Sequence, residues 1–263
     1  MSKLNLKNNG KTKRGKKIMK ILGSIAGVIA FLMVIGSVLQ GTYFRGKLEK
    51  VKPYGQFVDV KDGQMHVYSM GDGEKTIVLL PGMGVGLPSA HFSPLMRKLS
   101  EKHTVVTVEY FGVGFSSKTA RERSTENYVE EIREALKESG FKPPYVLIPH
   151  SMSSVYSEYY ASKYKEEVEG IISLDGTSSN YYEVMPSYIK YLLPIAKFQQ
   201  RAGIISIAEN LISKKDELLS YGYTEKEISD MITFSGFSIN DNLLEQVVST
   251  SEHIKDTKEL EFP

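Results

Sequence analysis

The residue best suited to covalent chemistry is Ser151, which lies where an apolar run ends and a helical pattern begins. Residues 145–148 are aromatic, β-branched or aliphatic, which predicts a buried strand, and residues 154–164 have the pattern of a helix. A serine on such a sharp strand-to-helix turn projects from the end of a sheet, with the free N–H groups of the helix behind it. This position suits a nucleophile whose reaction generates an oxyanion. The alternative is a serine that only caps the following helix.

Two loops that contain glycine follow other apolar runs and could complete a site around Ser151. Residues 81–86 come directly after the run at 76–80, and their glycines permit close approach of the backbone. The N–H of Met83 in this loop could face an oxyanion. The loop lacks the spacing of a nucleotide-binding motif, so a plain turn remains the other interpretation. Residues 109–117 form the second loop, and by itself it is typical of a structural turn.

The elements that must position these loops alternate between strands and helices. An alternating pattern at 56–60 and 64–69 predicts a hairpin. Further strands are predicted at 76–80, 104–109, 145–148 and 169–175, with helices at 92–101, 125–139 and 154–164. This order predicts an α/β fold, in which a mostly parallel sheet is flanked by helices. Ligands of such sheets bind at the carboxyl ends of the strands.

The pattern changes after the predicted core at 55–177. Residues 178–252 have no strand-like run, and helices are predicted at 186–200, 204–213, 224–234 and 242–251. A helical cap insertion of this kind commonly shapes a pocket over the sheet. Residues 253–263 resemble the lead-in to another strand, and we expect them to begin an incomplete C-terminal segment of the core.

Together these motifs resemble the α/β-hydrolase fold superfamily. The resemblance covers about residues 56–256, and its specific parts are the loops at 80–84 and 110–116 and the serine turn at 149–153. The family's turn usually has glycine two positions before and two after the serine. Pro149 and Ser153 stand at those positions here, so the turn departs from the family pattern.

The resemblance implies hydrolysis of an ester or amide through an acyl-enzyme on Ser151. The backbone N–H groups of Met83 and Met152 would form the oxyanion hole, and Asp175, at the end of its strand, is a candidate acid. A serine at this position, with no tryptophan in the chain, argues against relatives with a carboxylate nucleophile, such as haloalkane dehalogenases and epoxide hydrolases. No cofactor and no metal ion are implied. The expected partner is a small molecule or peptide with an apolar part.

The base that such a serine needs is harder to find among the five histidines. His66 and His103 lie in early elements and are expected to be structural. His150 adjoins the serine, but its side chain must point away from that of Ser151. His91 follows the glycine loop and His253 follows the cap, and neither occupies the family position. We therefore expect that the family's last two strands, with the usual acid and histidine, are missing from this chain. Impaired activity and an unstable core would follow.

The N-terminal part of the chain predicts a membrane anchor. Residues 1–20 carry eight lysines and arginines and no acid, and the nineteen residues at 21–39 carry no charge. As a helix this segment is about 28 Å long, close to the thickness of a bilayer's hydrocarbon core. The positive charges predict a cytoplasmic N-terminus and a catalytic domain outside the cell membrane. Only a weak signal-peptidase site is present at 37–41, so an uncleaved single-pass anchor is favoured, followed by a linker at 40–54.

Composition limits the other function classes. Outside the basic tail the chain is mildly acidic, which disfavours a nucleic-acid partner, and it contains no cysteine for thiol chemistry. A rival hypothesis from another class stays open. It is a non-catalytic, membrane-anchored binding protein that uses a hydrolase scaffold.

Overall fold

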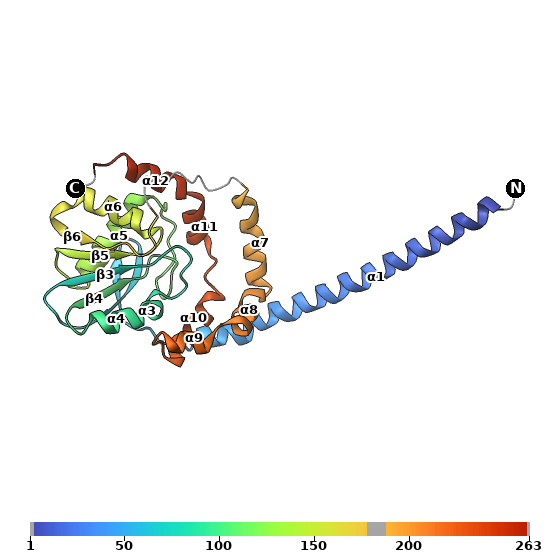
Figure 1. The fold of residues 1–263 in the computed structure, drawn as a ribbon, viewed down its shortest axis with the longest axis horizontal. Coiled ribbons are helices and arrows are strands. Elements are labelled where there is room, and N and C mark those ends of the chain that lie inside the picture. The colour runs from blue at the N-terminus through green and yellow to red at the C-terminus, as the bar shows by residue number, and fades with distance from the viewer. Residues whose placement is uncertain (1–2, 178–187, 262–263) are drawn as a thin grey trace.

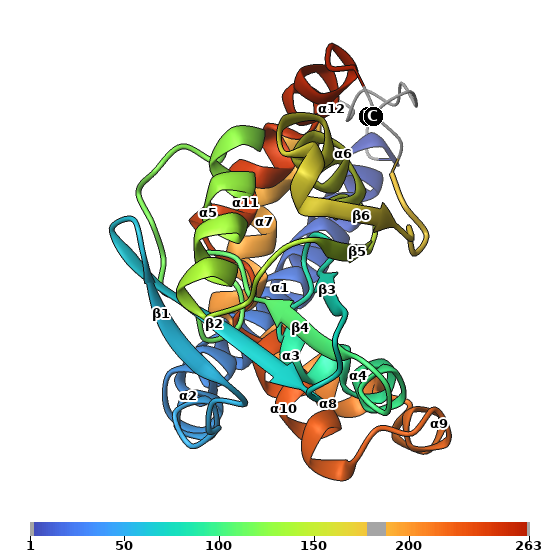
Figure 2. The ribbon, with the colours of Figure 1, turned by 90° about the vertical axis from the view of Figure 1, so that its left-hand side faces the viewer.

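The sheet that organises the molecule has six strands in the order β1-β2-β4-β3-β5-β6 (Figures 1 and 2). The computed structural model describes residues 3–177 and 188–261. The strands are β1 (Gln56–Val60), β2 (Gly63–Met70), β3 (Thr76–Leu80), β4 (Thr104–Val108), β5 (Tyr145–Pro149) and β6 (Val168–Ile171). The first two strands form the predicted hairpin, and the other four are parallel to one another. The predicted α/β class with a mostly parallel sheet is confirmed.

Each central strand is apolar on both faces because helices cover both sides of the sheet. In β3, Val78 and Leu80 belong to one buried cluster, whereas Ile77 and Leu79 belong to another. The first cluster packs beneath α5 (Thr125–Glu138), α6 (Ser153–Lys163) and α12 (Thr250–Lys258). The second packs beneath α4 (Ser93–Leu99), which follows the short helix α3 (Pro88–His91).

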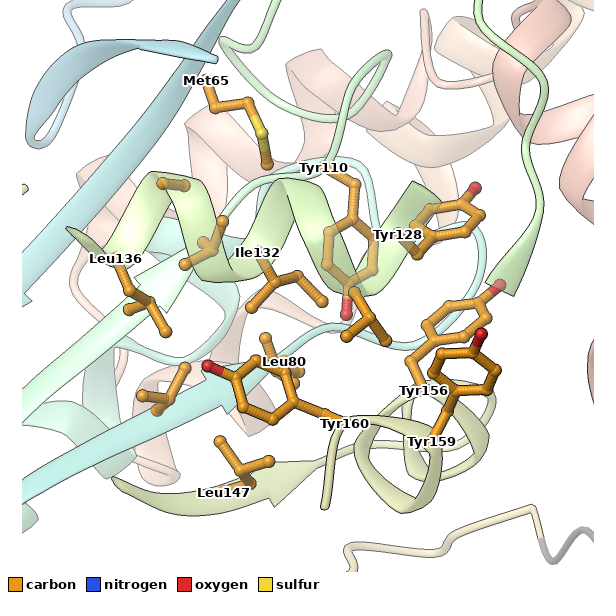
Figure 3. Packing of buried hydrophobic residues seen from close by; sticks show 14 of the residues in the cluster. Met65, Leu80, Tyr110, Tyr128, Ile132, Leu136, Leu147, Tyr156, Tyr159 and Tyr160 are labelled. Carbon is orange, nitrogen blue, oxygen red and sulfur yellow. The ribbon is translucent and has the colours of Figure 1, made fainter. Parts of the chain in front are cut away.

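Several buried tyrosines of the first cluster pack against one another beside α6 (Figure 3). The rings of Tyr128 and Tyr156 stack with centroids 4.4 Å apart, and Tyr110 meets both edge-on. The hydroxyl of Tyr110 lies 2.7 Å from that of Ser153, the first residue of α6. The loop after β4 and the beginning of α6 are therefore held together from within the core.

In the described residues 188–252 the predicted cap consists of helices joined by turns and loops, with no strand. Its helices are α7 (Ile189–Arg201), α8 (Ile204–Ile212), α9 (Lys215–Ser220), α10 (Glu225–Ser235) and α11 (Asp241–Val248). The short helix α9 was not predicted, and the single helix expected at 242–251 is divided at Ser249 between α11 and α12. Residues 178–187, assigned to the cap and to the start of its first helix, lie outside the described residues.

Two predictions about strands need correction. The last strand is shorter than expected, because β6 ends at Ile171 and only Leu174 rejoins the sheet, in a bridge to His150. Residues 259–261 do not begin a strand, since α12 continues to Lys258 and a turn follows; the last two residues lie outside the described part. The assignment of residues 253–263 to the core remains a prediction.

The N-terminal helix α1 (Lys3–Leu39) leaves the globular part and extends far beyond it (Figure 1). The described helix from residue 15 to residue 48 is apolar enough to cross a membrane, and only 6% of its most apolar window is buried in the molecule. The segment predicted as a linker, 40–54, is helical over its first nine residues. They continue the helix as a π-helical turn, Gln40–Phe44, and as α2 (Arg45–Leu48).

The end of α1 is attached to the cap. A Cβ atom at Gly36 would overlap the carbonyl oxygen of Ala202, so the two backbones approach more closely than any side chain would allow. Gln40, which is 6% exposed, donates a hydrogen bond to the carbonyl of Gly236 at 2.9 Å. Its side-chain oxygen accepts one from the buried hydroxyl of Ser206 at 2.7 Å. The orientation of the cap relative to α1 is thus fixed by backbone contact and by buried hydrogen bonds.

Candidate active site

Ser151 occupies a strained turn between β5 and α6. Its φ of +52° lies in the left-handed region, which residues other than glycine rarely adopt. The turn is held by its backbone, because the N–H of Ser151 donates to Leu174 at 3.1 Å and its carbonyl accepts from Thr177 at 3.1 Å. The residue itself is half-buried. A left-handed serine at this junction has the backbone geometry of a nucleophile turn.

The glycine loop after β3 lies directly beside this turn. A Cβ atom at Gly82 would come within 3.2 Å of the Ser151 Cβ and 2.6 Å of His150 Nδ1, so only glycine leaves room there. Met83 follows, half-buried against the core, and Met152 is 2% exposed. Among the residues that the structure describes, no acceptor takes the N–H of Met83 or of Met152. Both N–H groups are therefore unpaired within the described structure.

A cavity of about 430 Å³ begins at this loop and runs beneath the cap. Met83 and His91 line it from the core, and Tyr223, Ile228 and Met231 line it from the cap. The cavity is more apolar than polar at its wall, as expected for a site that binds a partly apolar molecule. The cap thus shapes a pocket at the carboxyl end of the sheet.

His91 and His150 form a pair near this pocket. Their rings stack with centroids 6.3 Å apart, and His150 Nδ1 is buried with no hydrogen-bond partner among the described residues. Burial, together with the neighbouring His150, lowers the pKa of His91, which therefore stays neutral at physiological pH. Neither ring forms a hydrogen bond with Ser151 in the described structure.

The second glycine loop is anchored by Glu109, a residue whose role was not predicted. Its fully buried carboxylate accepts from the hydroxyl of Ser89 at 2.7 Å and from the N–H of Phe115 at 2.7 Å, and it lies 3.2 Å from Nδ1 of His66. The prediction that His66 is structural agrees with these contacts. An acid at the end of an apolar strand was the signal that could have identified Glu109, because a buried carboxylate requires partners.

Asp175 lies close to the serine turn through the backbone, since it follows the Leu174 carbonyl that accepts from Ser151. It is exposed, and its φ of +45° is also left-handed. No histidine ring contacts its carboxylate in the described part of the chain. The acid role of Asp175 therefore stays a prediction.

His253 lies in the core, away from the pocket. It is 1% exposed, its Nδ1 lies 2.9 Å from the hydroxyl of Thr125, and its ring packs edge-on against Tyr128 and Tyr156. Burial, with a smaller effect of Arg123, lowers its pKa to about 4. These contacts between α5, α6 and α12 give His253 a structural role.

The lowered pKa of His253 predicts a loss of stability in weak acid. The unfolded chain binds a proton near pH 6.5, whereas the folded chain does so only near pH 4. Stability therefore falls as the pH drops below 6.5, by about 2 kcal/mol between pH 7 and pH 5. Urea unfolding in detergent at both pH values measures the change in the free energy of unfolding. The His253→Phe variant should lack the contribution of about 2 kcal/mol that comes from the histidine. An equal pH dependence in both proteins would contradict the assignment.

Comparisons with known proteins identify the fold. A family model described as the alpha/beta hydrolase fold matches residues 75–197, which include the glycine loops and the Ser151 turn. The chain belongs to the α/β-hydrolase fold superfamily. Among solved structures, this α/β-hydrolase is similar to the Cif epoxide hydrolase of Acinetobacter nosocomialis, with a TM-score of 0.60 and 16% identity over 84% of this chain and 73% of that one. A thermophilic esterase of Thermogutta terrifontis gives a TM-score of 0.58 and 15% identity over 76% and 73% of the two chains.

Two curated relatives of this α/β-hydrolase match it in sequence. The uncharacterised protein YbdG of Bacillus subtilis is 34% identical over 164 residues, which are 61% of this chain and 50% of that protein. The 2-(acetamidomethylene)succinate hydrolase of Mesorhizobium japonicum is 28% identical over 120 residues, 46% of this chain and 42% of the relative. The chain thus spans half or less of the length of these curated relatives.

Proposed function

We propose that this protein is a membrane-anchored serine hydrolase that cleaves an ester or amide through an acyl-enzyme on Ser151. The observation that carries the proposal is the left-handed turn at Ser151, where a strand of the parallel sheet meets a helix. Backbone strain of this kind persists where the surrounding structure holds it, and it is common at active sites. The family to which the chain belongs supports hydrolase chemistry in general.

The proposed reaction uses the groups beside the turn. The Ser151 oxygen attacks the carbonyl carbon of the substrate, and the N–H groups of Met83 and Met152 stabilise the negative oxygen that forms. The leaving alcohol or amine departs with a proton, and water then releases the acid from the serine. Because Gly82 has no side chain, the loop that carries Met83 packs directly against the turn that carries Ser151 and Met152. This close packing supports the assignment of the two N–H groups. The pocket beneath the cap would hold the apolar part of the substrate.

One observation favours the alternative of a non-catalytic binding protein on the same scaffold. None of the five histidines forms a hydrogen bond with Ser151 in the described structure, whereas a nucleophilic serine needs a base. We propose Asp175 as the acid, although no histidine ring contacts its carboxylate in the described part of the chain. The two candidate functions therefore differ in whether Ser151 is reactive.

Labelling with a fluorophosphonate distinguishes them. The serine oxygen displaces fluoride from phosphorus, and mass spectrometry of the full chain in detergent locates the adduct. We expect labelling of the wild type and of a control, Ser162→Ala on α6, with loss of labelling in Ser151→Ala. A folded wild-type chain that stays unlabelled would support the binding protein and overturn the enzyme.

We also propose that α1 spans the cell membrane, with residues 21–39 in the bilayer and the hydrolase domain on the extracytoplasmic side. The eight positive charges before the apolar segment support this orientation. The contacts of Gly36 and Gln40 with the cap support an uncleaved anchor, because cleavage at 37–41 would separate the helix from the cap. Protease added outside intact cells should digest the domain and leave the N-terminal tail protected.

A further inference from the structure

The cap carries an apolar surface that no described residue covers. On α7 the side chains of Leu192, Ile195 and Phe198 are 51–52% exposed. On α8, Leu211 and Ile212 are 81% and 73% exposed. Five large apolar side chains on two consecutive helices exceed the scattered exposure that is normal for a surface. We call these five residues the outer cap face.

The two sides of α7 differ in polarity and in what they contact. Its inner side binds the rest of the cap, since Gln200 exchanges two hydrogen bonds of 2.8 Å with Ile239, and Lys197 pairs with Asp241 on α11. At 100° per residue, Ile195 and Phe198 lie on the side away from Gln200. The side chains of Ile195 and Phe198 are thus directed out of the domain, although α7 has polar anchors on its other side.

The helices α7 and α8, which carry the outer cap face, lie on the side of the domain from which α1 departs (Figure 1). Figure 1 shows α7 at that edge, running across the direction of α1, with α8 beside the base of α1. The contact of Gly36 with Ala202, at the corner between α7 and α8, fixes this arrangement. A helix that lies across a membrane-spanning helix is parallel to the membrane plane. Side chains on the side of α7 from which α1 departs then meet the bilayer surface.

We propose that the outer cap face is a second membrane contact, which seats α7 and α8 in the outer surface of the lipid bilayer. The inference rests on the proposed membrane insertion of α1. We infer the bilayer as the partner because the apolar surface of α1 adjoins the cap. This exposed surface reaches Leu39, and the next residue, Gln40, accepts a hydrogen bond from Ser206 of α8. Tyr188, 60% exposed at the start of α7, is a residue type that concentrates at membrane interfaces. The cap pocket would consequently open close to the lipid headgroups.

Tryptophan fluorescence tests this contact without background, since the chain has no tryptophan. Single variants Leu192→Trp and Leu211→Trp of the full chain are placed in vesicles of phosphatidylcholine and phosphatidylglycerol that contain spin-labelled phosphatidylcholine. Ile172→Trp is the matched control, because Ile172 is 56% exposed and directly follows β6, which lies at the edge of the domain away from α7 (Figure 1). Leu32→Trp in α1 reports insertion of the anchor.

We expect the spin label to remove most of the emission at positions 32, 192 and 211, and little at 172. Quenching at 32 with only control-level quenching at 192 and 211 would overturn the cap contact and leave the anchor intact. No quenching at 32 would overturn both. Protection of 192 and 211 from aqueous iodide without quenching by lipid would indicate a protein partner and also overturn the inference. Fluorophosphonate labelling of Ser151 is independent of every one of these results.

Discussion

Replacement of Glu131 with alanine is expected to lower the free energy of unfolding by about 3–5 kcal/mol, because it leaves a buried charge without its partner. Glu131 is 1% exposed and accepts two hydrogen bonds, of 2.9 and 2.8 Å, from the fully buried guanidinium of Arg123. That guanidinium also stacks on Tyr128 at 4.0 Å, and its Nε has no partner among the described residues. Urea unfolding of the full chain in detergent measures the loss.

Two comparisons isolate the buried charge as the cause. Glu138→Ala removes an exposed carboxylate from the same helix, α5, and should change stability by less than about 0.5 kcal/mol. The double variant Arg123→Met, Glu131→Leu removes both charges and should be more stable than Glu131→Ala alone. If the double variant were the less stable of the two, the unpaired charge would not be the origin of the effect.

Gly36→Leu is expected to detach the cap from α1. The carbonyl oxygen of Ala202 occupies the place of any Cβ atom at Gly36, and a backbone atom cannot rotate away as a side chain would. The strain should cost about 3 kcal/mol, the upper part of the range for overpacked sites. The buried hydrogen bonds of Gln40 with Ser206 and with Gly236 would open as the backbones separate.

Hydrogen exchange of α7 and α8 measures this separation. The matched control is Gly27→Leu, because position 27 lies in the same helix and nothing approaches within 4 Å of a Cβ atom there. Both substitutions add the same apolar side chain to α1, so they affect membrane insertion alike. Faster exchange in Gly36→Leu alone is the expected result, and equal exchange in the two variants would contradict the close contact.

Much of the fold could be predicted from the sequence because each element carries its own pattern. The continuous apolar run of β3 indicates burial on both faces, and the structure places its alternate residues in two different clusters. The 3.6-residue period of α5 and the glycines after β3 are equally local signals. The weakest prediction concerned residues 40–48, where a linker was expected and a helix formed. Its helical state depends on contacts with the cap that lie far away in the sequence.

The candidate site was predictable only in part, for the same reason. Ser151 was identified by its place at a junction of two local patterns, and the adjacent loop by its glycines. The roles of the histidines depend on neighbours far along the chain, such as Glu109 for His66 and Thr125 for His253. No local pattern distinguishes a core histidine from a catalytic one, because burial and partners decide the pKa. Glu109 did carry a local signal, an acid at the end of an apolar strand, but its partners Ser89 and Phe115 are brought to it only by the fold.

The sequence by itself determined the order of strands and helices, the apolar N-terminal helix and the position of Ser151 at the end of β5, since these depend on the spacing of neighbouring residues. Only the tertiary structure decided that Gly82 lies against Ser151, that His253 is buried in the core, and that the end of α1 is fixed to the cap. These features depend on contacts between distant segments. Such contacts arise when the sheet and the cap pack, and no short stretch of the chain encodes them.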